Sequence, residues 1–369
     1  MNRFFIILIL ILLKSLHLYA QVEVGSYPID LDRDMKLHYS VDFVDKSLIE
    51  QRGTHLEWNL PETKSPLMKT ISITKGENIA QFEGEVIIVN SGDFTVYLQK
   101  KKNSVSEVGF AFKPASGYWH TVKYQKPVYF STKNMMYGAM FSDSTSFDLI
   151  LEREELPPEI LEALPSFVKK IKLVGELKRW YHFDAQGRFV LEDKKVAALR
   201  LKVKQNLRLR IYDVRSGDEI PVTNLASYKK IIPQAGNEIY YLYFSNEYKY
   251  YYAKISQTDI EDNYIIEYQK DDAEDNAYSL NAGEKIFLLY PNPTFDVSKI
   301  FISNYKPGTY SIEIYNIIGK KVKSWKVNIG KQTLLRYNLS FLRKGTYLVA
   351  LKDKYGNILA TRKLIIISV

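Results

Sequence analysis

Side chains suited to catalysis or metal binding are sparse in this sequence. The histidines beyond residue 20 are far apart and none sits at ligand spacing; they are His38, His55, His120 and His182. The chain has no cysteine, which excludes disulfides, thiolate metal sites and cysteine nucleophiles. It also lacks a nucleophile elbow, a zinc-protease helix motif, a phosphate-binding loop and a dinucleotide fingerprint. The sequence therefore assigns no catalytic residue, no metal ligand and no cofactor, and it favours a protein that is not an enzyme.

One run of aspartates has the spacing at which a calcium loop begins. Asp30, Asp32 and Asp34 alternate as its first ligands do, but Met35 stands where glycine is required. Val41 stands where the loop needs its final glutamate. We therefore expect a solvated segment here, with calcium binding as the alternative.

A second acidic cluster, at residues 271–275, is typical of an exposed acidic linker. No two carboxylates of the chain can be assigned as an acid and a nucleophile. That assignment depends on their separation in space, which sequence does not give. An exported carboxylate-based hydrolase acting on polysaccharide therefore stays open as the alternative function.

The segment from residue 240 to residue 252 is the most aromatic in the chain. Tyrosine rings can lie against sugar rings or a protein partner while their hydroxyls stay hydrated. A candidate aromatic binding strip consists of Tyr240, Tyr241, Tyr243, Tyr248, Tyr250 and Tyr252. The alternative, which we favour, is a pair of aromatic strands with one face in the core, because a buried face must be filled first.

Short strands separated by turn residues dominate the pattern, and helical periodicity is nearly absent. Hairpins are predicted around Asn90–Asp93, Asp184–Gly187 and Arg215–Asp218, because these turn residues have apolar or aromatic flanks. The pattern predicts an all-β protein with a β-sandwich-like body of one or two units. The expected units are an N-terminal β-rich body domain (21–150), a connector in which a short helix can form (151–170), a second β-rich body unit (171–269), an acidic linker (270–284) and a C-terminal domain (285–369).

The N-terminus predicts a secretory signal peptide at residues 1–20. Arg3 precedes an apolar run at residues 4–13, and cleavage is expected between Ala20 and Gln21. A membrane-spanning helix, the alternative, needs about 20 apolar residues, and Lys14 interrupts this run too early. The Sec translocon is thus an expected partner, and no stable transmembrane segment is expected after processing.

The charge distribution argues against nucleic-acid binding. The net charge is +9, yet residues 290–369 contain 14 basic and 3 acidic residues, whereas residues 21–289 contain 35 basic and 39 acidic ones. The basicity therefore belongs to the two ends, and no recognition motif accompanies it.

The C-terminal domain shows seven short alternating strands, which predict a small immunoglobulin-like sandwich. The expected strands are Lys285–Leu289, Lys299–Ile302, Thr309–Tyr315, Lys321–Asn328, Thr333–Leu339, Gly345–Leu351 and Asn357–Ile367. A Pro-Asn-Pro motif, the sequence IEIYNIIGKKV, a Gly-Thr-Tyr-Leu-Val strand and a terminal Lys-apolar strand follow one another in that order. In this order the motifs resemble the type A C-terminal sorting domain of the type IX (Por) secretion system, over residues 289–369.

That resemblance implies a place and a set of partners. It implies a protein that is secreted, or attached to the outer cell surface, of a Gram-negative bacterium. The implied partners are the type IX outer-membrane translocon and a sortase-like peptidase that removes the domain. The recognition-module positions implied by the family pattern are Pro291, Asn292, Pro293, Gly319, Gly345, Tyr347 and Lys363.

The body resembles uncharacterised type IX cargo proteins around Gly53–Leu60, which names no activity. Export signals, β-domains and aromatic strands favour a non-enzymatic module that binds a glycan or a surface protein. A structural component of the cell envelope is a further alternative.

Overall fold

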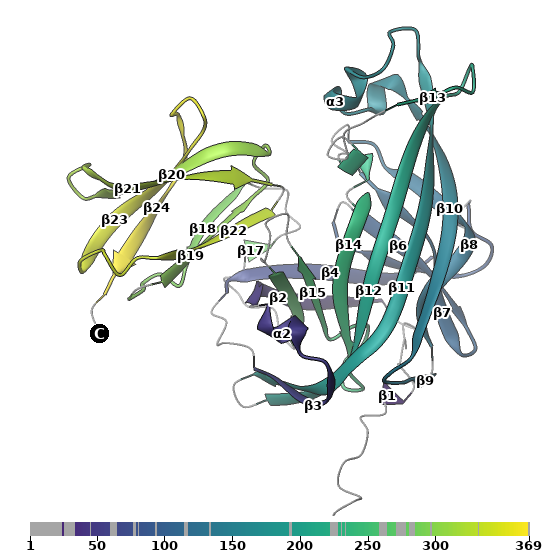
Figure 1. Cartoon of the computed structure of the whole chain (residues 1–369), viewed down its shortest axis with the longest axis horizontal. Coiled ribbons are helices and arrows are strands. Elements are labelled where there is room, and N and C mark those ends of the chain that lie inside the picture. Colours follow the sequence, from purple (N-terminus) through teal and green to yellow (C-terminus); the bar gives the residue numbers. More distant parts are fainter. Residues whose placement is uncertain are drawn as a thin grey trace, which may run out of the picture.

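The structure is a computed structural model of the whole chain (Figure 1). It describes residues 24–25 and 34–367 except for 45, 60–64, 77–78, 80, 93, 114–116, 133, 192–193, 222–227, 230, 233, 258–263, 271–277, 280–284, 296 and 331. The predicted signal peptide with Ala20 and Gln21, the residues Asp30 and Asp32, and the acidic cluster at 271–275 lie outside the described residues. No helix in the described part of the chain is long and apolar enough to cross a membrane.

Strand is the main secondary structure, at 68%, which confirms the predicted all-β fold. The body is built on one large sheet to which both predicted body units contribute strands, with β16 paired to β2. Along the sheet the strands are β10 (Met140–Glu152), β11 (Lys170–Leu191), β12 (Lys194–Asp213), β14 (Gly236–Phe244), β15 (Ala253–Gln257), β16 (Tyr264–Lys270), β2 (Met35–Val44), β4 (Leu67–Gly76), β5 (Val86–Asn90), β6 (Phe94–Lys101), β7 (Ser104–Phe112) and β8 (His120–Thr132). Side pairings add β3 (Gly53–Asn59), β13 (Glu219–Ile220) and β17 (Tyr278–Ser279), and a separate pair joins β1 (Val24–Gly25) to β9 (Asn134–Met135).

The two ends of this sheet lie side by side, so the sheet curls around a common interior (Figure 1). The Thr145 hydroxyl on β10 donates to the Lys126 carbonyl on β8 at 2.8 Å. The Tyr129 amide on β8 donates to the Asp143 carboxylate on β10 at 3.1 Å. Side chains substitute here for a ladder of backbone hydrogen bonds between the end strands.

Alternation along β12 decides which side chains enter the interior. Burial alternates at every position from Leu201 to Asp213, with the odd-numbered side chains buried. Odd positions are mostly apolar and even positions mostly basic, so a shift of one residue would bury the charges. The sequence of this strand therefore fixes one face inward and one outward.

The interior holds two apolar clusters with a polar group between them. One cluster is built around Phe110 and the other around Phe183. In the polar group, the Arg179 guanidinium donates to the carboxylate of Glu107 and to the side-chain oxygen of Gln205, both at 2.7 Å. Each charged group of this buried set thus has a partner, as burial requires.

The segment after β2 covers the outside of the sheet near β14 and β15. α2 (Ser47–Glu50) and β3 bring Trp58 into a buried cluster with Phe189 and Tyr243. The predicted hairpin at Asp184–Gly187 is wrong, because β11 runs through these residues with a bulge between Phe183 and Ala185. Gly187 instead allows close approach of β3, since a Cβ there would lie 2.1 Å from the Leu56 carbonyl oxygen. The hairpins at Asn90–Asp93 and Arg215–Asp218 are confirmed.

Short helical turns close one end of the interior. η1 (Arg153–Glu155) and α3 (Pro158–Leu161) form within the stretch between β10 and β11. Proline is suited to the first turn of α3, where its missing amide has no intrahelical partner. Ile160 and Val168 from this stretch pack into the cluster around Phe110.

The C-terminal region forms the predicted seven-stranded sandwich of two small antiparallel sheets. One sheet contains β18 (Ile286–Tyr290), β19 (Val297–Ser303) and β22 (Gln332–Asn338). The other contains β21 (Lys321–Ile329), β20 (Gly308–Asn316), β23 (Gly345–Lys352) and β24 (Ile358–Ile366), in that order. Their inner faces meet in a core that includes Ile312, Val349 and Leu364.

Candidate functional site

The Pro-Asn-Pro segment is bound to the last strand of the chain. The Asn292 side-chain amide donates to the Lys363 carbonyl at 2.7 Å, and its oxygen accepts from the Ile365 amide at 2.9 Å. Thr294 continues the pairing, with backbone bonds to Ile365 at 3.0 Å and Ile367 at 2.9 Å. The Tyr290–Pro291 and Asn292–Pro293 peptide bonds are both cis. This segment therefore covers the outer edge of β24, which unpaired would be open to edge-to-edge association.

The other motif positions lie at the same end of this sheet. Gly345 pairs with Ile366, and Tyr347 lies between Leu364 on β24 and Asn316 on β20. The Tyr347 hydroxyl donates to the Arg343 carbonyl at 2.8 Å. The structure therefore brings together residues separated by more than fifty positions.

Gly319 belongs to the turn that follows Asn316, at that same end. Its φ of +81° is in the region that favours glycine, and its amide donates to the Asn316 carbonyl at 2.9 Å. Ile317 and Ile318, just before it, are 76% and 80% exposed. Two such apolar side chains at the tip of a hairpin are available to a partner.

Comparison with known families identifies this unit. Residues 288–367 match the secretion system C-terminal sorting domain. This region is a type IX sorting domain. The resemblance seen in the motifs is confirmed, and the protein is a secreted cargo of that system. No curated protein matches the chain.

The sorting domain packs against the body through its three-stranded sheet. Val41, Leu67 and Ile265 of the body form one apolar cluster with five side chains of the domain, which are Ile286, Leu288, Tyr290, Phe301 and Leu334. Figure 1 shows this sheet facing the body, while β24 belongs to the other sheet, which lies on the side away from the body. Motif positions such as Asn292, Gly319 and Lys363 are exposed in this docked arrangement, so they stay accessible to a partner.

A charged pair lies within this contact. The Lys299 ammonium donates to the Asp42 carboxylate at 2.8 Å, and the Tyr290 hydroxyl donates to the same oxygen at 3.3 Å. The Asp42 side chain is 1% exposed. Burial, together with the negative charge of Asp42, raises the pKa of Tyr290, so this hydroxyl stays protonated and can donate.

Replacing Asn292 with alanine is expected to weaken the attachment of β24, because two hydrogen bonds are lost and the edge of the strand is opened. The expected effect is a loss of about 1–2 kcal/mol in the stability of the sorting domain. Faster amide exchange at Ile365 measures it. Asn328→Ala, which removes an exposed asparagine from β21, is the matched control, and equal exchange in both variants would contradict this role of Asn292.

The six tyrosines of the candidate binding strip are divided between two buried clusters. Four of them, Tyr241, Tyr243, Tyr248 and Tyr252, pack with Trp58 on the outer side of the sheet. Tyr250 packs in the interior, and Tyr240 is half-buried beside it. Burial raises the pKa of Tyr240 to about 12. Most of these rings are engaged by protein neighbours.

The histidines lie on separate strands and do not converge. The imidazole of His120 on β8 lies 3.9 Å from the Glu155 carboxylate, and burial lowers its pKa, opposed by the charge of Glu155. His38 on β2 shares a 3.2 Å hydrogen bond with Thr70. Within the described ranges, no three His, Asp or Glu side chains gather as metal ligands.

The outer face of β10, β11, β12 and β14 presents a row of side chains around Trp180, an indole that the sequence offers as an addition to an aromatic platform but does not align with neighbours on other strands. The register aligns Ser142, Trp180, Lys204 and Ile239 across the four strands. Trp180 is 47% exposed and Ile239 39%. The alternation along β12 indicates which of its residues face outward. The residues that lie beside them on neighbouring strands depend on the register of strand pairing, which the sequence does not show.

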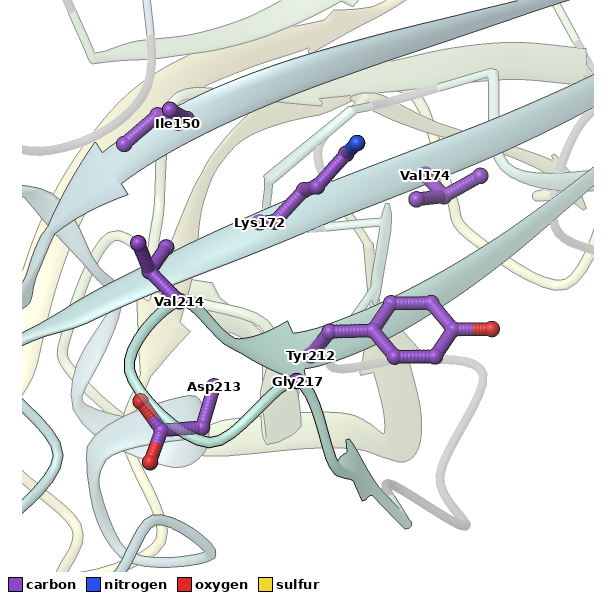
Figure 2. A pocket seen from close by; sticks show the side chains of 7 residues that line it. All are labelled: Ile150, Lys172, Val174, Tyr212, Asp213, Val214 and Gly217. Atoms are coloured by element: carbon purple, nitrogen blue, oxygen red, sulfur yellow. The ribbon is translucent and has the colours of Figure 1, made fainter.

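A shallow pocket lies farther along this outer face. It has a volume of about 360 Å³ and is lined by Ile150, Lys172, Tyr212 and Asp213, among others (Figure 2). Lys172 is paired with Asp148 at 2.9 Å. The Asp213 carboxylate accepts the Arg215 amide within its own turn at 2.9 Å. The lining thus supplies one carboxylate, already used by the turn, and not the pair that glycoside hydrolysis employs.

Proposed function

We propose that the body is a non-enzymatic module that binds a glycan or a protein partner at the cell surface through the outer face of β10, β11, β12 and β14. The observation that carries the proposal is the exposed row around Trp180. An indole on a rigid strand offers a flat apolar surface that loses little conformational entropy on binding. Met140, one strand away, is 71% exposed and extends this apolar surface.

The export route is part of the same proposal. A signal peptide ending at Ala20 delivers the chain through the Sec translocon, and the mature chain begins at Gln21. The outer-membrane translocon of the type IX system then engages the sorting domain, and a sortase-like peptidase removes it. The accessible motif end and the exposed Ile317 and Ile318 support this order, since they stay uncovered while the domain is docked on the body.

Replacing Trp180 with alanine tests the proposed binding face. Wild-type mature chain is screened against neutral and charged polysaccharides and against surface-protein extracts, and the variant is expected to bind at least about tenfold more weakly. Phe167→Ala is the matched control, because Phe167 is 66% exposed but lies in a turn away from this face. Equal binding by wild type and the Trp180 variant would refute the assignment. Turnover of any polysaccharide in the same screen would favour the hydrolase instead.

A further inference from the structure

Around Trp180 lie several cations for which the described part of the chain supplies no ion-pair partner. Across the strands, Trp180 lies opposite Lys204, while His182 lies opposite Lys202. Lys178 is two positions from Trp180 on the same strand, so it shares the outer face. Neighbouring strands are about 4.8 Å apart and alternate residues about 7 Å apart, so these groups occupy one small area.

Farther along the same face, Arg210 of β12 is paired with Glu176, and two lysines of β11 are paired as well. Lys170 contacts Glu152 at 2.6 Å, and Lys172 contacts Asp148 at 2.9 Å. Among the described residues, no ion pair joins Lys178, Lys202 or Lys204 to a carboxylate. The same two strands therefore carry neutralised cations at one end and unneutralised ones beside the exposed indole.

The environment of Lys202 shows the electrostatic consequence. Its pKa is lowered, and burial is the largest cause. The positive charges of Arg52, Lys204 and Arg200 lower the pKa further, whereas the negative charge of Asp184 raises it. The Lys202 ammonium also lies 5.6 Å from the centre of the Tyr241 ring. The strands hold these cations close together although they repel one another, and an anionic ligand would relieve that repulsion.

We propose, building on the function proposed above, that the ligand of this face is an anionic polysaccharide whose sugar rings carry carboxylate or sulfate groups. A sugar ring lies on Trp180, and its charged groups lie against Lys178, Lys202 and Lys204. The positive charge of this face favours an anionic ligand over a neutral one, and it also accelerates association of the ligand with the protein. A nucleic acid fits less well, because single strands are bound by successive stacked rings and this face presents one exposed indole.

The test measures binding of the mature full-length chain to alginate, a polyuronate, with neutral dextran and double-stranded DNA as competing probes. The double variant Lys202→Gln/Lys204→Gln is compared with Lys170→Gln/Lys172→Gln, which removes equal charge from the paired cations of the same face. The wild-type chain is expected to bind alginate, and its affinity for alginate is expected to fall as the salt concentration rises. The first double variant should bind at least about tenfold more weakly, and the second within about twofold of wild type. Circular dichroism checks that all variants fold.

Other outcomes separate this inference from the binding function on which it rests. Trp180-dependent binding of dextran or a protein, with no response to the lysine variants, overturns the anionic ligand and leaves the binding module standing. DNA binding that is as tight as alginate binding and is weakened by Lys202→Gln/Lys204→Gln overturns the polysaccharide and points to a general polyanion site on this face. No Trp180-dependent binding of any probe overturns both proposals.

Discussion

Replacing Arg200 with methionine is expected to destabilise the body by about 3–5 kcal/mol, because it leaves the buried Asp184 carboxylate without its countercharge. The two side chains are 0% and 1% exposed, and the guanidinium donates to the carboxylate at 2.7 Å. Arg200 also donates to the carbonyls of Ile49 and Gln51, which end the α2 segment. The change therefore also loosens the segment that covers the outside of the sheet.

Denaturant unfolding of the mature chain measures this effect. Lys204→Met is the matched control, because Lys204 is an exposed cation on the same strand and face, and its loss should change stability by less than about 0.5 kcal/mol. In the Arg200→Met background, adding Asp184→Leu is expected to restore part of the lost stability, because it removes the unpaired charge. The carbonyls that lost their donor keep the recovery incomplete. A further loss on adding Asp184→Leu would contradict this account of the pair.

Replacing Lys299 with alanine is expected to loosen the sorting domain from the body without unfolding either. Asp42 would keep the hydrogen bond from the Tyr290 hydroxyl but lose the one from the Lys299 ammonium, within a buried contact. Loss of this hydrogen bond to a buried carboxylate is expected to destabilise the contact between the domain and the body by about 1–3 kcal/mol. This corresponds to about 5- to 150-fold more frequent local opening of the contact.

Amide hydrogen exchange at Val41 and Leu67, which lie in the contact, reports this opening. Lys326→Ala is the matched control, because Lys326 is an exposed lysine on β21, in the other sheet of the domain. Exchange that accelerates equally throughout the sandwich would show that Lys299 stabilises the domain itself, and it would refute a specific role in docking. If docking leaves the motif end accessible, secretion of the Lys299 variant should match that of wild type.

The sorting domain was predicted from sequence almost strand by strand. Its strands are short, they alternate clearly, and turn residues separate them, so that local patterns specify most of the topology. The role of Asn292 was not predicted, because it depends on a contact with Lys363, which is 71 positions away.

The body was less predictable, and Asp184–Gly187 shows why. A sequence rich in turn formers was interpreted as a hairpin, whereas the long strand β11 continues through it. Asp184 is needed there for the buried pair with Arg200, and Gly187 for the close approach of β3. Both reasons arise from contacts with distant segments, so local propensity pointed to the wrong structure.

By itself, the sequence determined the all-β class, the inward and outward sets of strands such as β12, and the sorting domain, because these depend on a period of two and on turn residues that act locally. Only the tertiary structure decided that β2 pairs with β16, across more than two hundred residues. It also decided that most tyrosines of the aromatic segment are buried while Trp180 is exposed on the outer face of the sheet. A two-residue period shows which side chains share a face, but the partners of each strand and the segments that cover it decide which face meets solvent.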